Sequence, residues 1–313
     1  MVSNKEKNFI SAVIYVNNNE DHIGYFLENL NSVLEENFEK YEIICVNDSS
    51  TDKSIEKIRE FGDKVKGPVL SVINMSFYQG MELSMNAGVD LAIGDFVYEF
   101  DSLFIDYDLN TIIDLYRVSL KGFDIVSATS SKAKGTFSEL FYKVFNSTSN
   151  STYNIQTESF RILSRRAINR VHSMSKTIPY RKVMYANCGL KFERLVYSQI
   201  RQNKPKHTKE IRDKRKELAT DSLILFTDIA YKFSITMTLV MMFIAILVGF
   251  YTVFIFLKGD PVAGWTTTML FLDFGFIGIF AVLAIIIKYL SILINLTFKM
   301  QKYTIESIEK ITK

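Results

Sequence analysis

The chain has few of the residues that build metal centres and disulfide frameworks. Its 313 residues include only two cysteines, Cys45 and Cys188, and three histidines, which lie far apart in the sequence. Neither set has the spacing of a zinc site, so we expect reduced thiols in the cytosol and no zinc centre. Residues 1–8 are polar and the apolar run after them is short, so we expect no secretion signal. The composition does not predict a disulfide-rich or exported soluble domain.

Long hydrophobic runs, in contrast, occur twice near the C-terminus. Ile235 to Leu257 and Thr266 to Ile287 each reach the ~20 residues that a helix needs to cross a ~30 Å hydrocarbon core. The polar link 258–265 can turn a helical hairpin but is too short for a domain. Two buried helices of a soluble core are the alternative. The length of both runs and the basic residues around them favour a membrane hairpin.

Basic residues flank this hairpin on both sides. The segment 201–216 carries eight lysines or arginines against two acidic residues, and lysines also follow the second run. By the positive-inside rule, we expect the soluble domain and both termini to be cytoplasmic, with two spans of the cell membrane. Asp273 lies inside the second run, where a charge usually faces protein. The small residues Gly275 and Gly278 leave room for contact between helices, including those of a second copy.

An amphipathic segment precedes the hairpin. In 221–233, apolar residues recur at helical spacing, which suits a helix lying on the membrane surface or packed against the soluble domain. The predicted division of the chain is a cytoplasmic domain at 1–217, an amphipathic juxtamembrane helix at 218–234, a first transmembrane helix at 235–257, an external turn at 258–265, a second transmembrane helix at 266–290 and a cytoplasmic tail at 291–313.

Residues 9–100 alternate between strand and helix patterns. Apolar, β-branched runs predict strands at Phe9–Val16, Tyr41–Val46, Val69–Ile73 and Phe96–Phe100, and apolar residues at helical spacing predict helices at Ile23–Leu34, Ile55–Phe61 and Glu82–Ala92. This alternation predicts an α/β domain with a mostly parallel sheet covered on both faces. Ligands bind beyond the carboxyl ends of such strands, where we expect the polar segments 17–20 and 47–52 to meet Asp101.

These motifs occur in the order found in family 2 glycosyltransferases. V-I-Y-V-N-N-N-E at 13–20 resembles the family's P-V-Y-N-E-E start, V-N-D-S-S-T-D at 46–52 resembles its V-D-D-G-S-x-D loop, and Asp101 begins its D-x-D motif. V-A-G-W-T-T at 262–267 resembles the membrane turn of the polyisoprenyl-phosphate glycosyltransferases, a subfamily with a two-helix C-terminal anchor. The resemblance implies a GT-A-type, Rossmann-like domain plus a C-terminal transmembrane helical hairpin.

The resemblance also implies an activity. A single hexose would move, with inversion, from a nucleotide sugar to a polyisoprenyl phosphate at the cytoplasmic membrane face, and a UDP-linked donor is favoured over a GDP-linked one. The partners would be the nucleotide sugar, the lipid phosphate and the bilayer, and no nucleic acid is expected. The donor-binding residues that the resemblance implies are Val16, Asn18, Glu20, Asp48, Gly80 and Asp101, with Asp48 contacting the base.

The catalytic residues that the resemblance implies are Asp101 and Arg161. Asp101 would hold a divalent ion, Mg²⁺ or Mn²⁺. Glu99 is a candidate second ligand, because residues two apart on a strand point the same way. The acceptor phosphate would be bound by Arg161, Ser164, Arg165, Lys214, Arg215 and Lys216, and the last three could equally form a patch that attracts anionic lipid.

The active-site signature departs from the family pattern. The second carboxylate of the D-x-D motif is replaced by Leu103, the first Asp of the second motif by Asn47, and the Asp of the acceptor motif by Ser159. The change at Ser159 is chemically tolerable, because a lipid phosphate is mostly ionised near neutral pH and can attack without a strong base. Asp106 and Asp108 are further candidates for the missing metal carboxylate if the loop bends back, but solvated loop charges are the favoured interpretation. The departures leave a second hypothesis, a catalytically inactive homologue that acts as a membrane scaffold or regulator.

Overall fold

The computed structural model describes residues 5–65, 67–131, 142–147, 153–174, 180–200 and 303–312, together with single positions between 236 and 293. The chain divides into two compact units. The first comprises Met1–Asn146, Ser151–Asp213 and Met300–Lys313, and the second comprises Ser147–Asn150 and Lys214–Lys299. The sheet and the candidate site belong to the first unit.

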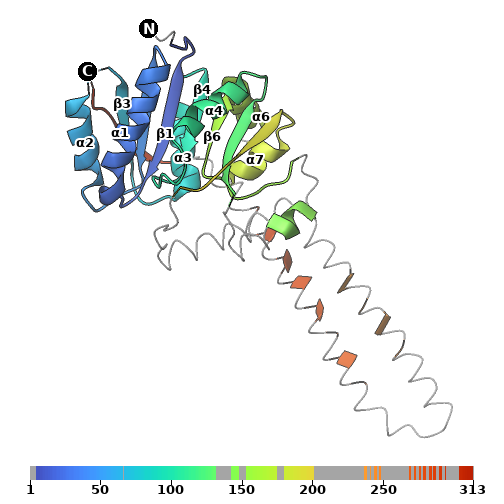
Figure 1. The fold of residues 1–313 in the computed structure, drawn as a ribbon. Coiled ribbons are helices and arrows are strands. Elements are labelled where there is room, and N and C mark those ends of the chain that lie inside the picture. Colours follow the sequence, from blue (N-terminus) through green and yellow to red (C-terminus); the bar gives the residue numbers. More distant parts are fainter. Residues whose placement is uncertain are drawn as a thin grey trace, which may run out of the picture. The chain divides into compact units, whose positions relative to one another are not determined.

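The first unit is built on one eight-stranded sheet (Figure 1). Its strands are β1 (Ile10–Val16), β2 (Tyr41–Asn47), β3 (Val69–Met75), β4 (Phe96–Phe100), β5 (Ile125–Ser130), β6 (Phe160–Ser164), β7 (Phe192–Tyr197) and β8 (Ile305–Lys310). Their order across the sheet is β7-β5-β6-β4-β1-β2-β3-β8. Only β6 and β8 run against the others, so the sheet is mostly parallel, as the sequence predicts.

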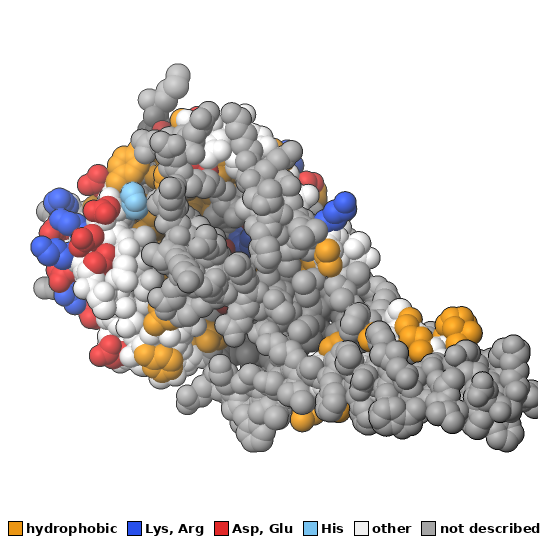
Figure 2. All heavy atoms as spheres, turned by 90° about the horizontal axis from the view of Figure 1, so that it is seen from below, with side chains coloured by type: hydrophobic (Ala, Val, Ile, Leu, Met, Phe, Trp, Pro, Cys, Tyr) orange, Lys and Arg blue, Asp and Glu red, His pale blue; other side chains and the backbone are white. Residues whose placement is uncertain are grey.

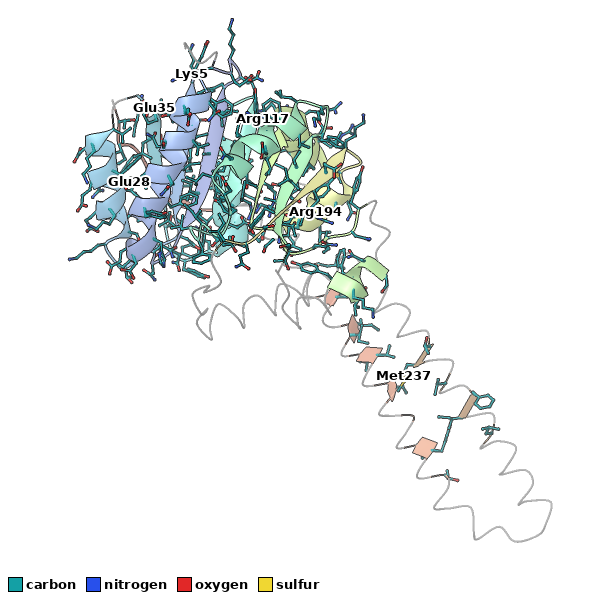
Figure 3. All side chains as sticks on the ribbon, viewed as in Figure 1. Lys5, Glu28, Glu35, Arg117, Arg194 and Met237 are labelled. Carbon is teal, nitrogen blue, oxygen red and sulfur yellow. The ribbon has the colours of Figure 1, made fainter. Side chains whose placement is uncertain are left out.

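Helices cover both faces of this sheet (Figure 1). One face is covered by α1 (Glu20–Asn37), α2 (Ser54–Lys64) and α4 (Asn110–Ser119), and the other by α3 (Met81–Leu91), α6 (Arg165–Met174) and α7 (Arg181–Asn187). Helix α1 buries apolar residues at helical spacing, among them Ile23, Leu27 and Leu30. Glu28 and Glu35 project from its exposed side (Figure 3). This pattern is why the sequence predicts α1 so clearly.

Helix α3 approaches the sheet closely at Gly88. A side chain at this position would collide with Val13 of β1 and Val46 of β2. The glycine therefore allows the helix to pack directly on the two central strands. As a result, the first turn of α3 lies beside the carboxyl ends of these strands, where the candidate site is found.

The last strand, β8, comes from the segment predicted as a cytoplasmic tail. It pairs antiparallel with β3, from Ser71 opposite Lys310 to Met75 opposite Ile305. Arg59 of α2 reaches Glu309 of β8 at 2.9 Å. Figure 2 shows basic and acidic side chains mixed along one margin of the molecule. The C-terminal residues are thus an integral part of the sheet.

The four strands and three helices predicted in residues 9–100 are confirmed, with small shifts of their ends. Among the residues that the structure describes, no helix is long and apolar enough to cross a membrane. Most of both predicted transmembrane runs, and all of the amphipathic segment 218–234, lie outside the described residues. The transmembrane hairpin therefore stays a prediction.

Candidate active site

The loops that follow β1 and β2 are tied together by polar side chains. Asn18 Oδ1 accepts a hydrogen bond from the backbone N–H of Thr51 at 2.8 Å, and Glu20 Oε2 accepts one from the backbone N–H of Lys53 at 2.9 Å. Asn18 has a positive φ of 50°, a conformation that asparagine adopts more readily than most residues. Two of the predicted donor residues, Asn18 and Glu20, therefore fix the shape of the carboxyl-end loops.

Asp48, just after β2, holds the loop between β3 and α3. Its side chain is fully buried. Oδ1 accepts a hydrogen bond from Gln79 N at 2.8 Å, and Oδ2 accepts hydrogen bonds from Gly80 N and from the Tyr15 hydroxyl, each at 2.9 Å. The backbone N–H of Asp48 donates to the Val16 carbonyl at 2.9 Å. All three of these hydrogen bonds to the Asp48 carboxylate come from its own chain.

Gly80 and Tyr15 are both adapted to the buried Asp48 carboxylate. Gly80 has φ 88° and ψ 159°, a region that is essentially restricted to glycine. Burial and the charge of Asp48 raise the pKa of Tyr15 above its ordinary value, so the phenol remains protonated and donates its hydrogen bond. The predicted donor residues Val16, Asp48 and Gly80 are thus brought together at one edge of the sheet.

Four charged side chains form a closed ring at the carboxyl end of β4. Glu99 Oε2 lies 2.6 Å from Arg161 Nη1, and Glu99 Oε1 lies 2.9 Å from Arg181 Nη1. Asp101 Oδ2 lies 2.9 Å from Arg161 Nη2, and Asp101 Oδ1 lies 2.7 Å from Arg181 Nη2. Each carboxylate therefore bridges both guanidinium groups. The prediction that Glu99 and Asp101 point the same way is confirmed.

Two further glutamates extend the ring. Arg161 Nε donates to Glu158 Oε2 at 3.1 Å, just before β6. The backbone N and the Nε of Arg181 both donate to Glu82 Oε2, each at 3.0 Å. Glu82 lies in the first turn of α3 and Arg181 is the first residue of α7. The arrangement, which we call the charge ring, thus joins β4 and β6 to α3 and α7.

The charge ring is almost closed to water. Arg161 is 1% exposed, Arg181 is 0% exposed and the Asp101 side chain is 12% exposed. Burial opposes ionisation of Asp101, but the charges of Arg181 and Arg161 outweigh it and hold the pKa of this carboxyl well below its usual range. Burial lowers the pKa of each arginine, but the charges of Asp101 and Glu99 raise it by more, so both pKa values lie above their ordinary value. Asp101 and both arginines are therefore charged at neutral pH.

The predicted metal ligands do not fit a divalent ion in this arrangement. Both oxygens of Asp101 and both oxygens of Glu99 lie within 2.9 Å of a guanidinium nitrogen. An ion bound to them at the ~2.0–2.1 Å typical of Mg²⁺ would lie against two positive charges. In the described part of the chain, no group of three or more His, Cys, Asp or Glu side chains could hold a metal ion.

The residues after Asp101 turn away from the charge ring. Leu103, which replaces the second carboxylate of the D-x-D motif, is buried in the hydrophobic core. Asp106 is buried and accepts a hydrogen bond from the Tyr197 hydroxyl at 2.7 Å, so its interpretation as a solvated charge is wrong. Asp108 is exposed, as expected. Of the two described carboxylates further along this loop, Asp106 is buried and Asp108 accepts a hydrogen bond from the backbone N–H of Asn110 at the start of α4.

The residues predicted to bind the acceptor phosphate are not brought together. All three guanidinium nitrogens of Arg161 donate to carboxylates of the charge ring, namely those of Glu158, Glu99 and Asp101. β6 runs antiparallel to β4, so Ser164 and Arg165 lie at the amino end of β4, away from Asp101. There Ser164 Oγ donates to Asp124 at 2.9 Å, and Arg165 Nε donates to a backbone carbonyl. The prediction of one phosphate site shared by these three residues is contradicted, because the extended strand separates Arg161 from Ser164 and Arg165, and its direction places only Arg161 beside Asp101. The other predicted members, Lys214, Arg215 and Lys216, lie outside the described residues.

Sequence reasoning missed Arg181 and Glu82. Each belongs to a different helix from a different part of the chain, and neither lies in a recognisable motif. Nothing around Arg181 distinguishes it from a solvent-exposed arginine, because its burial depends on α7 packing beside β4 and α3. An acidic residue in the first turn of a helix, such as Glu82, is common for reasons of helix stability alone.

Comparison with known proteins identifies the family to which this chain belongs. The family described as Glycosyl transferase family 2 matches residues 11–171, slightly more than half of the chain. The chain therefore belongs to glycosyl transferase family 2, and the resemblance to that family is confirmed. A mannosyltransferase from Pyrobaculum calidifontis, solved in complex with GDP-Man and Mn²⁺, is similar with a TM-score of 0.51 at 14% identity, over 70% of this chain and 63% of that chain. This likeness confirms the GT-A-type α/β fold.

Curated relatives match part of the chain. An uncharacterised glycosyltransferase of Synechocystis is 28% identical over 188 residues, which are 58% of this chain and 58% of that protein. A prophage bactoprenol glucosyl transferase homolog of Escherichia coli K12 is 27% identical over 198 residues, which are 60% of this chain and 62% of that protein. The match thus spans less than two thirds of either relative.

Proposed function

We propose that this protein transfers a single hexose from a nucleotide sugar to a polyisoprenyl phosphate at the cytoplasmic face of a membrane. Membership of glycosyl transferase family 2 supports the reaction type. The name of the Escherichia coli relative, a bactoprenol glucosyl transferase homolog, supports the lipid acceptor. A UDP-linked donor and inversion at the anomeric carbon follow from the resemblance of the sequence motifs.

The observation that carries the proposal is the convergence at the carboxyl edge of the sheet. Asn18 follows β1, Asp48 follows β2 and fixes Gly80 at the start of α3, and Asp101 follows β4, the neighbour of β1. Ligands of open α/β sheets bind outside the carboxyl ends of the strands. The polar, hydrogen-bonded loops at this edge suit a polar ligand rather than an apolar one.

The path of the chain supports attachment to a membrane. The chain leaves the sheet after β7 and re-enters it before β8, and both points lie at the carboxyl edge. A segment that leaves and returns on one side of a bilayer crosses it an even number of times, which agrees with the two spans predicted at 235–257 and 266–290.

Nine large apolar side chains described between Val240 and Leu293 are 43–61% exposed. Apolar surface of this extent favours a bilayer or a protein partner over water.

For the proposed reaction, the protein mainly has to hold the donor sugar and the lipid phosphate next to each other. An oxygen of the ionised lipid phosphate attacks the anomeric carbon, and the bond from that carbon to the donor diphosphate breaks, releasing the nucleoside diphosphate. Because the acceptor is already ionised, no strong base is required at Ser159. Arg161 is held in the charge ring, so the acceptor phosphate is assigned to the basic segment Lys214–Lys216, close to the predicted membrane surface.

The test is transfer of label to a lipid. The full chain is purified in detergent and incubated with undecaprenyl phosphate and a panel of radiolabelled nucleotide sugars, and label in the organic phase is counted. We expect label with one donor, and its loss in Asp101→Asn. Asp108→Asn is the matched control, because Asp108 is an exposed carboxylate on the same loop and asparagine serves equally well at the start of a helix.

A catalytically inactive homologue is the second candidate, and two observations favour it. Leu103 is buried where the family has a carboxylate, and both oxygens of Asp101 are held by arginines. Under this alternative the protein would scaffold or regulate a membrane partner. Absence of label with every donor, while the Escherichia coli relative transfers label in parallel, would contradict the transfer and favour this alternative.

A further inference from the structure

The two arginines of the charge ring carry the positive charge that a divalent ion would carry. The resemblance places one divalent ion, with a charge of +2, against the carboxylates at the end of β4. In this chain, two guanidinium groups supply the same +2 to Glu99 and Asp101, and every oxygen of these two carboxylates has a guanidinium nitrogen within 2.9 Å. The second carboxylate of the D-x-D motif is replaced by Leu103, which is turned into the core.

We propose that Arg181 takes the place of the divalent ion at Asp101, so that this protein binds its nucleotide donor without Mg²⁺ or Mn²⁺. The statement about the ion concerns the charge ring alone. The statement about the donor rests on the proposed function.

Arg181 is fixed by the fold rather than loosely placed. It is fully buried, and Glu82 accepts hydrogen bonds from both its backbone N–H and its Nε, each at 3.0 Å. Tyr185, one turn further along α7, donates its hydroxyl to Glu99 Oε1 at 2.7 Å. The two side chains lie on the same side of the helix, as residues four apart do. Helix α7 thus presents both side chains to β4, and an incoming ion would have to displace a packed helix residue.

One nitrogen of Arg181 is not satisfied by the ring. Nη1 is buried and lies 2.9 Å from Glu99 Oε1, but its N–H bonds make no hydrogen bond with the described residues. A buried guanidinium nitrogen normally has a hydrogen-bond acceptor. Nη1 therefore keeps donor capacity that the described carboxylates do not use.

The first experiment uses the unmodified full chain in detergent. Mn²⁺ binding is followed by electron paramagnetic resonance, and binding of UDP and GDP is measured by calorimetry with Mn²⁺ and with a chelator. We expect no Mn²⁺ bound at the charge ring, and a nucleotide affinity that changes less than ~5-fold between the two conditions, below the usual range of coupling between two sites. A larger gain with Mn²⁺ that disappears in Asp101→Asn would overturn the proposal.

The second experiment removes the guanidinium. Arg181→Ala leaves Glu82, Glu99 and Asp101 facing one space, so we expect this variant to gain Mn²⁺ binding and its Tm to rise when Mn²⁺ is added. Arg181→Lys keeps a positive charge and should not gain it. Arg166→Ala is the matched control, because Arg166 pairs with the single carboxylate Asp124 at the other end of the sheet.

The outcomes separate this inference from the proposed function. If neither nucleotide binds, the proposed function fails, while the Mn²⁺ signal of the unmodified chain still decides whether Arg181 replaces the ion. If Arg181→Ala does not fold in the absence of metal, refolding with Mn²⁺ but not with a chelator supports the inference. Mn²⁺ bound by the unmodified chain and lost in Asp101→Asn contradicts it.

Discussion

Gln79 and Thr304 are 225 residues apart in the sequence, yet they are joined by two hydrogen bonds. Gln79 Nε2 donates to the Thr304 carbonyl at 2.6 Å, and the Thr304 N–H donates to Gln79 Oε1 at 2.9 Å. The backbone N–H of Gln79 also donates to Asp48. The segment that returns to the sheet at β8 is thus linked directly to the loop that Asp48 orders at the candidate donor site.

Gln79→Ala is expected to weaken both the fold and the donor site. It removes two hydrogen bonds to half-buried backbone groups of Thr304, whose carbonyl keeps only the Ser76 N–H, at a cost of about 0.5–1.5 kcal/mol for each bond. Urea unfolding measures the loss, and calorimetry measures the accompanying decrease in nucleotide affinity. Gln79→Glu keeps the acceptor but not the donor, so it should fall between wild type and alanine. Equal stability of all three proteins would show that the link contributes nothing.

Gly80→Ala is expected to disturb the donor loop through its backbone. The added methyl group meets no atom within 4 Å, so the cost comes only from φ 88° and ψ 159°, and is about 1–3 kcal/mol. The Gly80 N–H then leaves Asp48, and nucleotide affinity falls. Gly24→Ala is the matched control, because it also has free space but lies in helix α1, where alanine stabilises by about 0.5–1 kcal/mol. Opposite shifts of Tm in the two variants are predicted, and shifts of the same sign would contradict this reading.

Arg161→Ala is expected to cost about 3–5 kcal/mol of unfolding free energy, because it leaves the buried carboxylate of Glu158 without its arginine and leaves Glu99 with only one of its two arginines. Arg166 also pairs with a buried carboxylate, Asp124, but its own side chain is 67% exposed. Water can replace it, so Arg166→Ala should change stability far less. Chemical denaturation of the two variants side by side makes the comparison. A similar loss in both would mean that the charge ring has no special role in stability.

The ion pairs of Asp101 predict a pH dependence. Its folded pKa is below the ordinary value of 3.8, so the stabilisation is present above the unfolded pKa and is lost as the pH falls through the folded one. Asp101→Asn removes this contribution. The difference in unfolding free energy between wild type and Asp101→Asn should therefore be largest near neutral pH and shrink below about pH 4. A difference that does not vary with pH would exclude a charged Asp101 in the native state.

The sequence predicts the parallel half of the sheet well. β1 and β2 are buried on both faces, so they are nearly continuous apolar runs, and the polar segments after them mark the carboxyl edge. That is why Asn18, Asp48 and Asp101 could be placed near one another before the structure was known. β8 could not be predicted, because its alternating pattern in a short charged segment is typical of an exposed tail as much as of an edge strand.

The acceptor side and the charge ring were not predictable for a different reason. The direction of β6 is a property of the sheet and not of its five residues, and its reversal moves Ser164 and Arg165 away from Asp101. Likewise, the partners of Asp101 come from β6 and α7, 60 and 80 residues further along the chain. Local patterns carry no information on such contacts, which depend on how separate elements pack.

The most direct test is the transfer of label from a nucleotide sugar to undecaprenyl phosphate, measured in one preparation with Mn²⁺ and with a chelator. The account predicts label in the organic phase at similar rates under both conditions, and its loss in Asp101→Asn but not in Asp108→Asn. Label that appears only with Mn²⁺ would contradict the role given to Arg181. No label with any donor, beside an active relative, would contradict the transfer itself.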